Sequence, residues 1–193
     1  MEIDGSKRIA LAFTILYLVI FTIISLARKN YEFLIYLAVM LFFFFLILFF
    51  RKNIHLSSGA IWGLSLWGLL HVGCGNIYLH GVRLYDIRLL NLVGMDHLVH
   101  AFGFCVATIV GYQLLRPFLK KEADKSYLIL FLAVMIGMGF GALNEVIELF
   151  STLVLKDTGV GDYFNNAFDL VFNLVGAMIA ACIIKMRCHK WKQ

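Results

Sequence analysis

Six ionisable side chains interrupt otherwise apolar stretches of this chain, in types and spacings that suit metal binding or proton transfer. Asp96 and His100 are four residues apart, so on a helix both project from one face and can serve one metal ion or act as an acid–base pair. Glu145 and Glu148 are three residues apart and also share a helical face. An ionised side chain deep in a bilayer costs about 2.5–3.5 kcal/mol on insertion scales, so it is seldom kept without a partner or a role. The expected metal ligands are His71, Asp96, His100, Glu145, Glu148 and Asp169, and the expected catalytic groups among them are Glu145, Glu148 and His100.

Each pattern also has a structural interpretation. Asp96 and His100 can form a hydrogen bond between helices, and two glutamates near a helix end can cap it or pair with a basic residue. Asp169 and Asn173 can join helices by hydrogen bonds alone. His97 lies about 100° around the helix from Asp96 and is expected to face the lipid headgroups.

Composition places these residues in a membrane protein. Of the 193 residues, 62% are hydrophobic and 15% are charged, and a soluble domain of this size could not bury so much apolar surface. The net charge of +5 sits in short basic clusters between apolar segments, which suits contact with membrane lipids, and no motif indicates a nucleic-acid partner. The four cysteines form no CxxC pair, so neither a zinc knuckle nor a disulfide framework is indicated.

Six segments are long and apolar enough to cross a bilayer, which predicts an all-α, polytopic bundle of six transmembrane helices. The first has a longer apolar core than a signal peptide and acidic residues before it, so we expect an uncleaved helix. No linker or repeat divides the chain, which predicts a single domain over residues 1–193 with its polar site formed by about residues 70–173. The predicted segments are residues 9–27, 31–50, 56–79, 92–115, 126–150 and 165–184.

The basic residues predict the orientation of this bundle. Twelve of the 17 Lys and Arg residues lie in the N-terminal region, the loops at 51–55 and 116–125, and the C-terminal tail, and five lie on the alternate side. The positive-inside rule then places both termini in the cytoplasm.

The same topology brings the polar residues to one depth. With cytoplasmic termini, His71 lies near the outer end of the third segment, and the polar residues of the next three segments also fall in the extracytoplasmic leaflet. The first two segments carry no ionisable residue in their cores beyond two tyrosines and are expected to be peripheral. Gly139 and its neighbours Gly137 and Gly141 are expected to permit close helix approach.

Four stretches of the chain resemble the signatures of a known family. They are LHVGCG at 70–75 followed by Tyr78, DHLVHAFG at 96–103, NEVIEL at 144–149, and GDYFN from 161 followed by Asp169, Asn173 and the Gly-Ala pair at 176–177. In order and spacing these are similar to the YjdF-type family of small bacterial inner-membrane proteins, and more loosely to VanZ-like proteins linked to teicoplanin resistance. The resemblance covers roughly residues 60–182 and supports the fold and the list of site residues. The chain departs from it at Asn144, Leu149 and Asn165, and the last change removes a carboxylate.

Three classes of function fit these observations. The leading hypothesis is an enzyme of the cell envelope that uses a divalent metal ion to activate water against a lipid or lipid-linked substrate. The second is a module that binds a cation or relays protons. The third is a non-enzymatic envelope or interaction protein whose polar layer sets helix register. The residues do not specify the substrate, the metal or the oligomeric state.

Overall fold

Six α-helices form most of the chain. The computed structural model describes residues 4–89, 93–120 and 126–190, with side chains as far as residue 187. Four two-residue strands form two antiparallel pairs, β1 with β2 and β3 with β4, and the 3₁₀ turn η1 (Leu84–Asp86) lies between the pairs. The 3₁₀ turn η2 (Arg116–Phe118) follows α4. The helices are α1 (Gly5–Arg28), α2 (Tyr31–Phe49), α3 (Ser58–Asn76), α4 (Met95–Leu115), α5 (Tyr127–Val154) and α6 (Tyr163–Lys190), and the strands are β1 (Tyr78–Leu79), β2 (Val82–Arg83), β3 (Arg88–Leu89) and β4 (Val93–Gly94).

Polar residues begin the first three helices. The side chains of Asp4, Asn30 and Ser57 each accept a hydrogen bond from the backbone N–H three residues later, which satisfies a donor that the helix itself leaves free. Lys29 adopts a left-handed conformation, with φ of 55°, and turns the chain from α1 into α2. The end of α1 at Arg28 agrees closely with the predicted residue 27, whereas the helix begins at Gly5, four residues before the predicted residue 9, because Asp4 caps it there.

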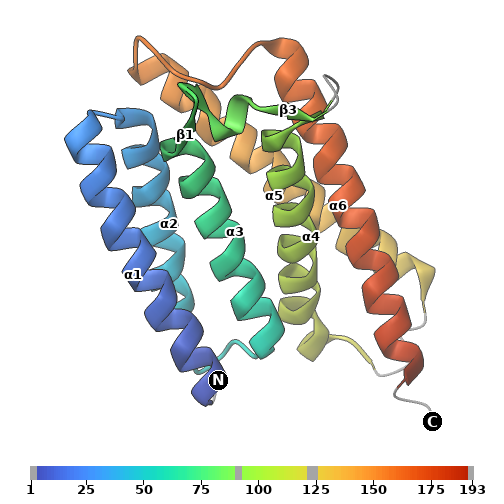
Figure 1. The fold of residues 1–193 in the computed structure, drawn as a ribbon. Helices are drawn as coiled ribbons and strands as arrows, with labels where there is room; N and C mark the ends of the chain where they lie inside the picture. Colours follow the sequence, from blue (N-terminus) through green and yellow to red (C-terminus); the bar gives the residue numbers. More distant parts are fainter. Residues whose placement is uncertain (1–3, 90–92, 121–125, 191–193) are drawn as a thin grey trace.

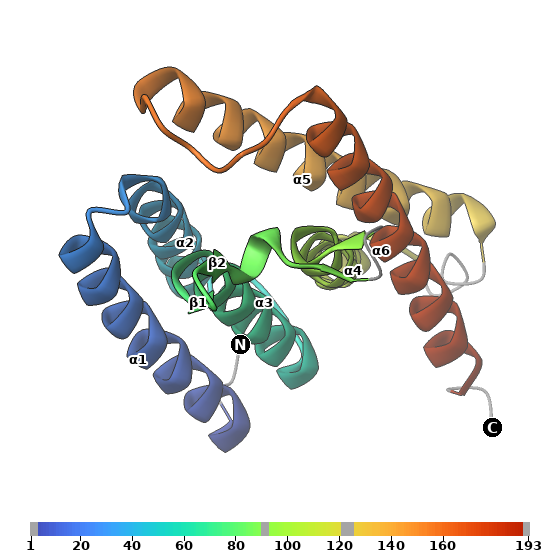
Figure 2. The same cartoon turned by 45° about the horizontal axis from the view of Figure 1, so that its top comes forward.

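The helices form a bundle whose two ends differ (Figure 1). The described start of α1 and end of α6 lie at one end, and the short strands with η1 lie at the other. Figure 2 shows α3 and α4 between two flanks, with α1 and α2 on one side and α5 and α6 on the other. Contacts between α3 and α4 join the two halves, and α4 also packs on α5 and α6.

Small residues allow α4 and α6 to approach closely. A Cβ atom on Gly176 would lie 2.0 Å from the backbone oxygen of Ala101, so α6 passes directly over the backbone of α4 at this point. On α5, Gly137 and Gly141 are buried against Thr108 and Asn173. The prediction for Gly139 was wrong, because no other described part of the chain lies within 4 Å of the Cβ that this residue lacks.

Five of the six helices are long and apolar enough to cross a membrane: α1, α2, α5, α6, and α4 with the turn that follows it. The predicted third span is less apolar, because α3 is 19 residues long but rich in glycine and serine. This helix also ends at Asn76, before the predicted residue 79, because the chain there enters the β1–β2 hairpin. The predicted start of the fourth span at residue 92 falls outside the described residues, and α4 begins at Met95.

Candidate functional site

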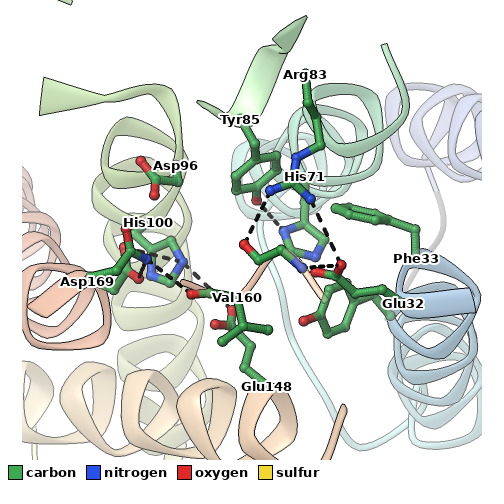
Figure 3. Close-up of a pocket in the computed structure, with 13 residues that line it drawn as sticks. Glu32, Phe33, His71, Arg83, Tyr85, Asp96, His100, Glu148, Val160 and Asp169 are labelled. Carbon is green, nitrogen blue, oxygen red and sulfur yellow. Dashed lines mark hydrogen bonds and ion pairs between the residues drawn. The ribbon is translucent and has the colours of Figure 1, made fainter. Parts of the chain in front are cut away.

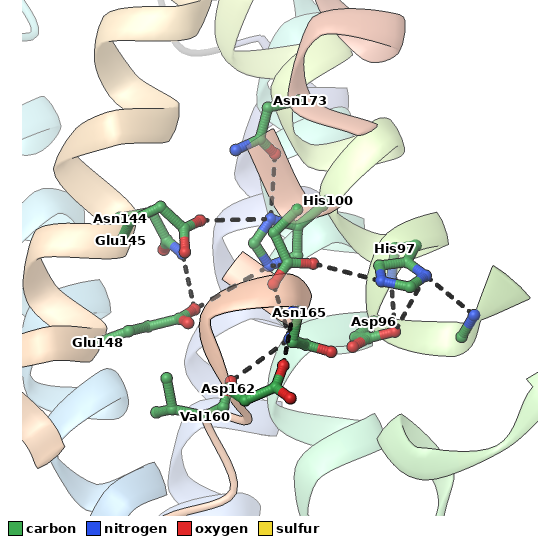
Figure 4. Close-up of polar contacts among 12 residues, drawn as sticks. Asp96, His97, His100, Asn144, Glu145, Glu148, Val160, Asp162, Asn165 and Asn173 are labelled. Carbon is green, nitrogen blue, oxygen red and sulfur yellow. Dashed lines mark hydrogen bonds and ion pairs between the residues drawn. The ribbon is translucent and has the colours of Figure 1, made fainter. Parts of the chain in front are cut away.

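Histidine and carboxylate side chains meet at the end of the bundle that carries the strands (Figure 4). His100, near the start of α4, is at their centre and is buried. Its Nε2 atom lies 3.8 Å from Oδ1 of Asp169 on α6 and 4.0 Å from Oε1 of Glu148 on α5. Its Nδ1 atom lies 3.8 Å from Oε1 of Glu145, one turn before Glu148. Three helices thus supply one imidazole and three carboxylates to a single point.

Each of three ligand-type side chains has an asparagine beside it. Asn144 donates to Oε1 of Glu148 over 2.8 Å, and Asn165 donates to Oδ2 of Asp169 over 2.9 Å. In both pairs the amide precedes the carboxylate by four residues, so the two side chains share a helical face. Oδ1 of Asn173, on α6, lies 3.0 Å from Nδ1 of His100. These amides orient the acids and the imidazole without adding charge.

A second histidine adjoins this cluster from the first turn of α4. Nδ1 of His97 accepts a hydrogen bond from the backbone N–H of Gly94 over 3.0 Å, and its Nε2 lies 4.0 Å from Oδ1 of Asp169. The carboxylate of Asp96 accepts from the backbone N–H of His97 over 2.7 Å and lies at the edge of the cluster. Two groups of three side chains are close enough to share one metal ion, because the ligand atoms in each group lie within 4.8 Å of one another. The groups are Asp96–His97–Asp169 and His100–Glu145–Asp169, and Asp169 belongs to both.

Several polar atoms of the cluster have no hydrogen-bond partner among the described residues. These unpartnered atoms are buried, and they are Oδ1 of Asp169, both carboxylate oxygens of Glu145 and Nε2 of His97. The ion pairs that the structure records around these acids come from histidine. Carboxylates this close in a medium of low dielectric constant cannot all be ionised unless a cation or bound protons neutralise them. The donor set of imidazole and carboxylates suits a divalent transition-metal ion.

The cluster forms one wall of a small cavity, and His71 lies on the opposite wall (Figure 3). The volume is about 30 Å³, enough for an ion or one or two water molecules. Nδ1 of His71, on α3, lies 2.5 Å from the phenol oxygen of Tyr85 in η1. The His71 ring also packs among those of Phe33 and Tyr36. Burial raises the pKa of Tyr85 well above its usual value, so the phenol keeps its proton at neutral pH.

Helix α2 contributes to this cavity, which corrects the prediction that the first two segments are peripheral. Glu32, in the first turn of α2, lines the cavity with Phe33 and Tyr36. Sequence reasoning missed Glu32 because it lies only three residues after Lys29, the end of the basic pair that separates the first two segments. The available signal was an acidic residue at the start of an apolar run, and the structure shows that its side chain is buried.

Glu32 belongs to a latch of three residues, Glu32, Arg83 and Gly159, that ties α2, β2 and the α5–α6 connection together. Oε2 of Glu32 accepts from the backbone N–H of Gly159 over 2.7 Å and lies 3.8 Å from Arg83. Arg83 also donates to the carbonyl of Gly159 and makes two bonds to Asp86. Burial is the largest influence on Arg83 and disfavours its charge, but the bonds to Asp86 and the charges of Asp86 and Glu32 together outweigh burial and raise the pKa of the guanidinium. A Cβ on Gly159 would collide with Arg83, so glycine permits this approach.

Of the six predicted site residues, the structure brings five together: Asp96, His100, Glu145, Glu148 and Asp169. His71 lines the same cavity but lies outside both candidate ligand groups. The expectation that His97 faces headgroups was wrong, because its ring is buried and stacks on Phe172 with the centroids 4.9 Å apart. The assignment of these residues as metal ligands or catalytic groups stays a prediction.

Comparison with models of protein families tests the resemblance to YjdF-type proteins that the sequence motifs suggested. Residues 9–190 match the model of a family described as "Predicted membrane protein (DUF2238)". The chain belongs to this family. YjdF-type proteins form a DUF2238 family, whereas no finding bears on the looser resemblance to VanZ-like proteins. A search of curated proteins found no match, and neither did a search of solved structures.

Proposed function

We propose that this member of the DUF2238 family crosses the bacterial inner membrane six times, with both termini in the cytoplasm and its His/carboxylate site in the extracytoplasmic leaflet. The 19 residues of α3 span about 28 Å at 1.5 Å per residue, close to the thickness of the hydrocarbon core. In addition, α3 runs between the two ends of the bundle and packs on α1 and α4, and its Ser65, Gly68, Gly73 and Gly75 are buried in protein. The excess of Lys and Arg at the end that carries the termini supports this orientation.

The site, we propose, binds one divalent metal ion through His100, Glu145 and Asp169. The observation that carries this proposal is the buried Oδ1 of Asp169, which has no hydrogen-bond partner among the described residues and lies 3.8 Å from Nε2 of His100. Two ligands of one tetrahedral zinc ion are roughly 3.3–3.5 Å apart, so a small contraction would close this pair on a metal. Charge supports the same conclusion, since a divalent cation neutralises the carboxylates that surround His100.

Glu148 is the proposed general base. It lines the cavity and is held by Asn144, whereas Glu145 is not among the residues that line it. A metal ion lowers the pKa of a bound water, and a neighbouring carboxylate can accept the proton. The reaction class is therefore metal-assisted hydrolysis. Because the cavity is too small for a bulky substrate, only the bond to be cleaved would enter it, with the rest of a lipid or lipid-linked envelope substrate outside.

A second candidate function is favoured by the small cavity itself. A volume of about 30 Å³ lined by acids on one wall and by His71 and Tyr85 on the other also suits a cation or a chain of proton carriers. In that case the site binds an ion without cleaving any substrate, and the polar layer also sets the register of the helices.

The decisive experiment measures metal content and hydrolysis on full-length protein in detergent. Asp169→Asn keeps the shape of a ligand and removes its charge, so bound metal and hydrolysis should both be lost. Glu148→Gln should keep the metal and lose hydrolysis. Asp157→Asn makes the same change at an exposed carboxylate and should match the wild type. Hydrolysis is followed as release of water-soluble or altered lipid products from vesicles of total bacterial lipid.

The outcomes separate the hypotheses. Metal in the wild type with no lipid cleavage under any condition would favour the cation-binding module. Wild-type protein that binds no divalent metal at any pH, together with an Asp169→Asn variant of equal or greater thermal stability, would end the metal hypothesis. The polar layer would then be architectural, because removing a desolvated charge without a cation relieves the fold.

A further inference from the structure

The hydrogen bonds of His97 assign the position of its proton. The backbone N–H of Gly94 can only donate, so Nδ1 of His97, 3.0 Å away, must accept. The neutral ring then carries its proton on Nε2. A nitrogen that carries a proton has no lone pair for a metal, so His97 cannot ligate through Nε2 while this bond exists.

The opposite holds for His100. Its Nδ1 lies 3.0 Å from Oδ1 of Asn173, and an amide oxygen can only accept, so Nδ1 carries the proton. Nε2 of His100 therefore presents its lone pair toward Asp169 and Glu148, 3.8 and 4.0 Å away. Two histidines one turn apart on α4 thus face the carboxylate of Asp169 with their Nε2 atoms. Nε2 of His97 carries a proton, whereas Nε2 of His100 carries a lone pair.

The ring of His97 is held with its Nε2 directed at Asp169 but beyond hydrogen-bond distance. It is 9% exposed, and it lies parallel to the ring of Phe172 within 9°. Its Nε2 has no hydrogen-bond partner among the described residues and lies 4.0 Å from Oδ1 of Asp169. Asn165 already holds the other oxygen, Oδ2.

We infer that His97 is a positioning residue that holds the Asp169 carboxylate for the metal ion, and that it is not itself a ligand. This inference rests on the proposed metal site. Asn165 already holds one oxygen of this ligand. When Asp169 binds the metal, the N–H of His97 would hold the other oxygen, in the way that outer hydrogen-bond partners orient the ligands of many metal centres. The group formed by Asp96, His97 and Asp169 is then a support for the metal site and not a second one.

The test is the same substitution at both histidines, His97→Gln and His100→Gln, in the full-length protein. Glutamine at the third position of a helix can accept from the N–H of the capping residue, so His97→Gln keeps the bond from Gly94 and alters the contact with Asp169. Affinity for Zn²⁺ is measured in detergent by competition with a chromophoric chelator, and thermal unfolding is recorded without metal. His97→Gln should weaken zinc binding about 10- to 100-fold with unchanged metal-free stability, whereas His100→Gln should weaken it further.

Three results would overturn the inference. Zinc affinity of His97→Gln equal to that of the wild type would leave His97 with a capping role only. A loss equal to that of His100→Gln would make His97 a ligand. A wild type that binds no zinc would remove the proposed function itself, which distinguishes that failure from the first two.

A second measurement needs no variant. In wild-type protein labelled with ¹⁵N-histidine, nitrogen shifts separate protonated from unprotonated ring positions. His97 should carry its proton on Nε2 both with and without zinc, and the Nε2 signal of His100 should move when zinc is added. A His97 Nε2 without its proton in the zinc-loaded protein would contradict the positioning role.

Discussion

Replacing Gly176 by Ala should force α4 and α6 apart beside the candidate site. The new Cβ would lie 2.0 Å from the backbone oxygen of Ala101 and 2.9 Å from the backbone nitrogen of Cys105, whereas real contacts of this kind stay above 3.0 Å. The helices must therefore separate by about 1 Å, because backbone atoms cannot rotate away as a side chain could. Overpacking of this kind typically costs about 1–3 kcal/mol of unfolding free energy.

The displacement also reaches the site. Ala101 follows His100 directly, and Gly176 follows Asn173 by three residues, so the strained contact adjoins the 3.0 Å bond between these two side chains. A shift of about 1 Å would break that bond and move Nε2 of His100 relative to Asp169. Misplacement by this amount can reduce a catalytic rate on the order of 100-fold. Gly176→Ala should thus weaken zinc binding as well as stability.

Gly139→Ala is the matched control on α5. Nothing lies within 4 Å of the Cβ it would add, and Ala favours a helix over Gly by roughly 0.5–1 kcal/mol. Thermal unfolding of both variants in detergent should therefore show a lower Tm for Gly176→Ala and an equal or higher Tm for Gly139→Ala. For a chain of this size, 1 kcal/mol corresponds to roughly 2–4 °C.

One result would refute this reasoning. If Gly176→Ala unfolds at the wild-type temperature and binds zinc normally, the backbones of α4 and α6 are not in contact at Gly176 and Ala101. The geometry of the site, which depends on that contact, would then be incorrect.

Three further predictions concern the latch, the cavity wall and the topology. Glu32→Gln should lower stability by about 1–3 kcal/mol in thermal unfolding, because Arg83 loses a charged partner and Gly159 a charged acceptor; a variant as stable as the wild type would show that the latch is not formed. Because the pKa of Tyr85 is raised in the folded protein, folding holds the phenol proton more tightly, and stability should fall as pH rises above about 10, the usual pKa of a tyrosine. Tyr85→Phe should reduce that alkaline loss, and an identical pH profile would contradict the burial of this phenol. A cytoplasmic reporter fused after Gln193 should be active and a periplasmic reporter inactive, and the reverse would overturn the orientation of the site.

Much of the candidate site could be read from local spacing. Asp96 with His100, and Glu145 with Glu148, repeat at helical intervals within apolar segments, and that pattern alone placed each pair on one face. The depth of the cluster followed from the alternating direction of successive helices. His71 was expected among the metal ligands for the same reason. It pairs instead with Tyr85, on the cavity wall opposite the cluster, because the β1–β2 hairpin and η1 bring that phenol over the end of α3.

The contributions of α2 could not be read this way. Glu32 reaches the cavity because it bonds to Gly159, 127 residues later in the chain, and no pattern within α2 encodes a partner at that separation. The buried position of His97 was missed for a related reason. Its angle on the helix points away from Asp96, and only the packing of Phe172 on α6 shows that this direction leads into the protein.

The sequence by itself determined that the chain is helical, that it belongs in a membrane, and that its ionisable residues fall at one depth. These properties depend on composition and on intervals of three and four residues, which act within single helices. The tertiary structure alone decided which oxygen and nitrogen atoms face one another, because that depends on how α4, α5 and α6 cross. Their crossing is set by contacts such as Gly176 on Ala101, where the absence of one side-chain carbon lets two distant segments meet.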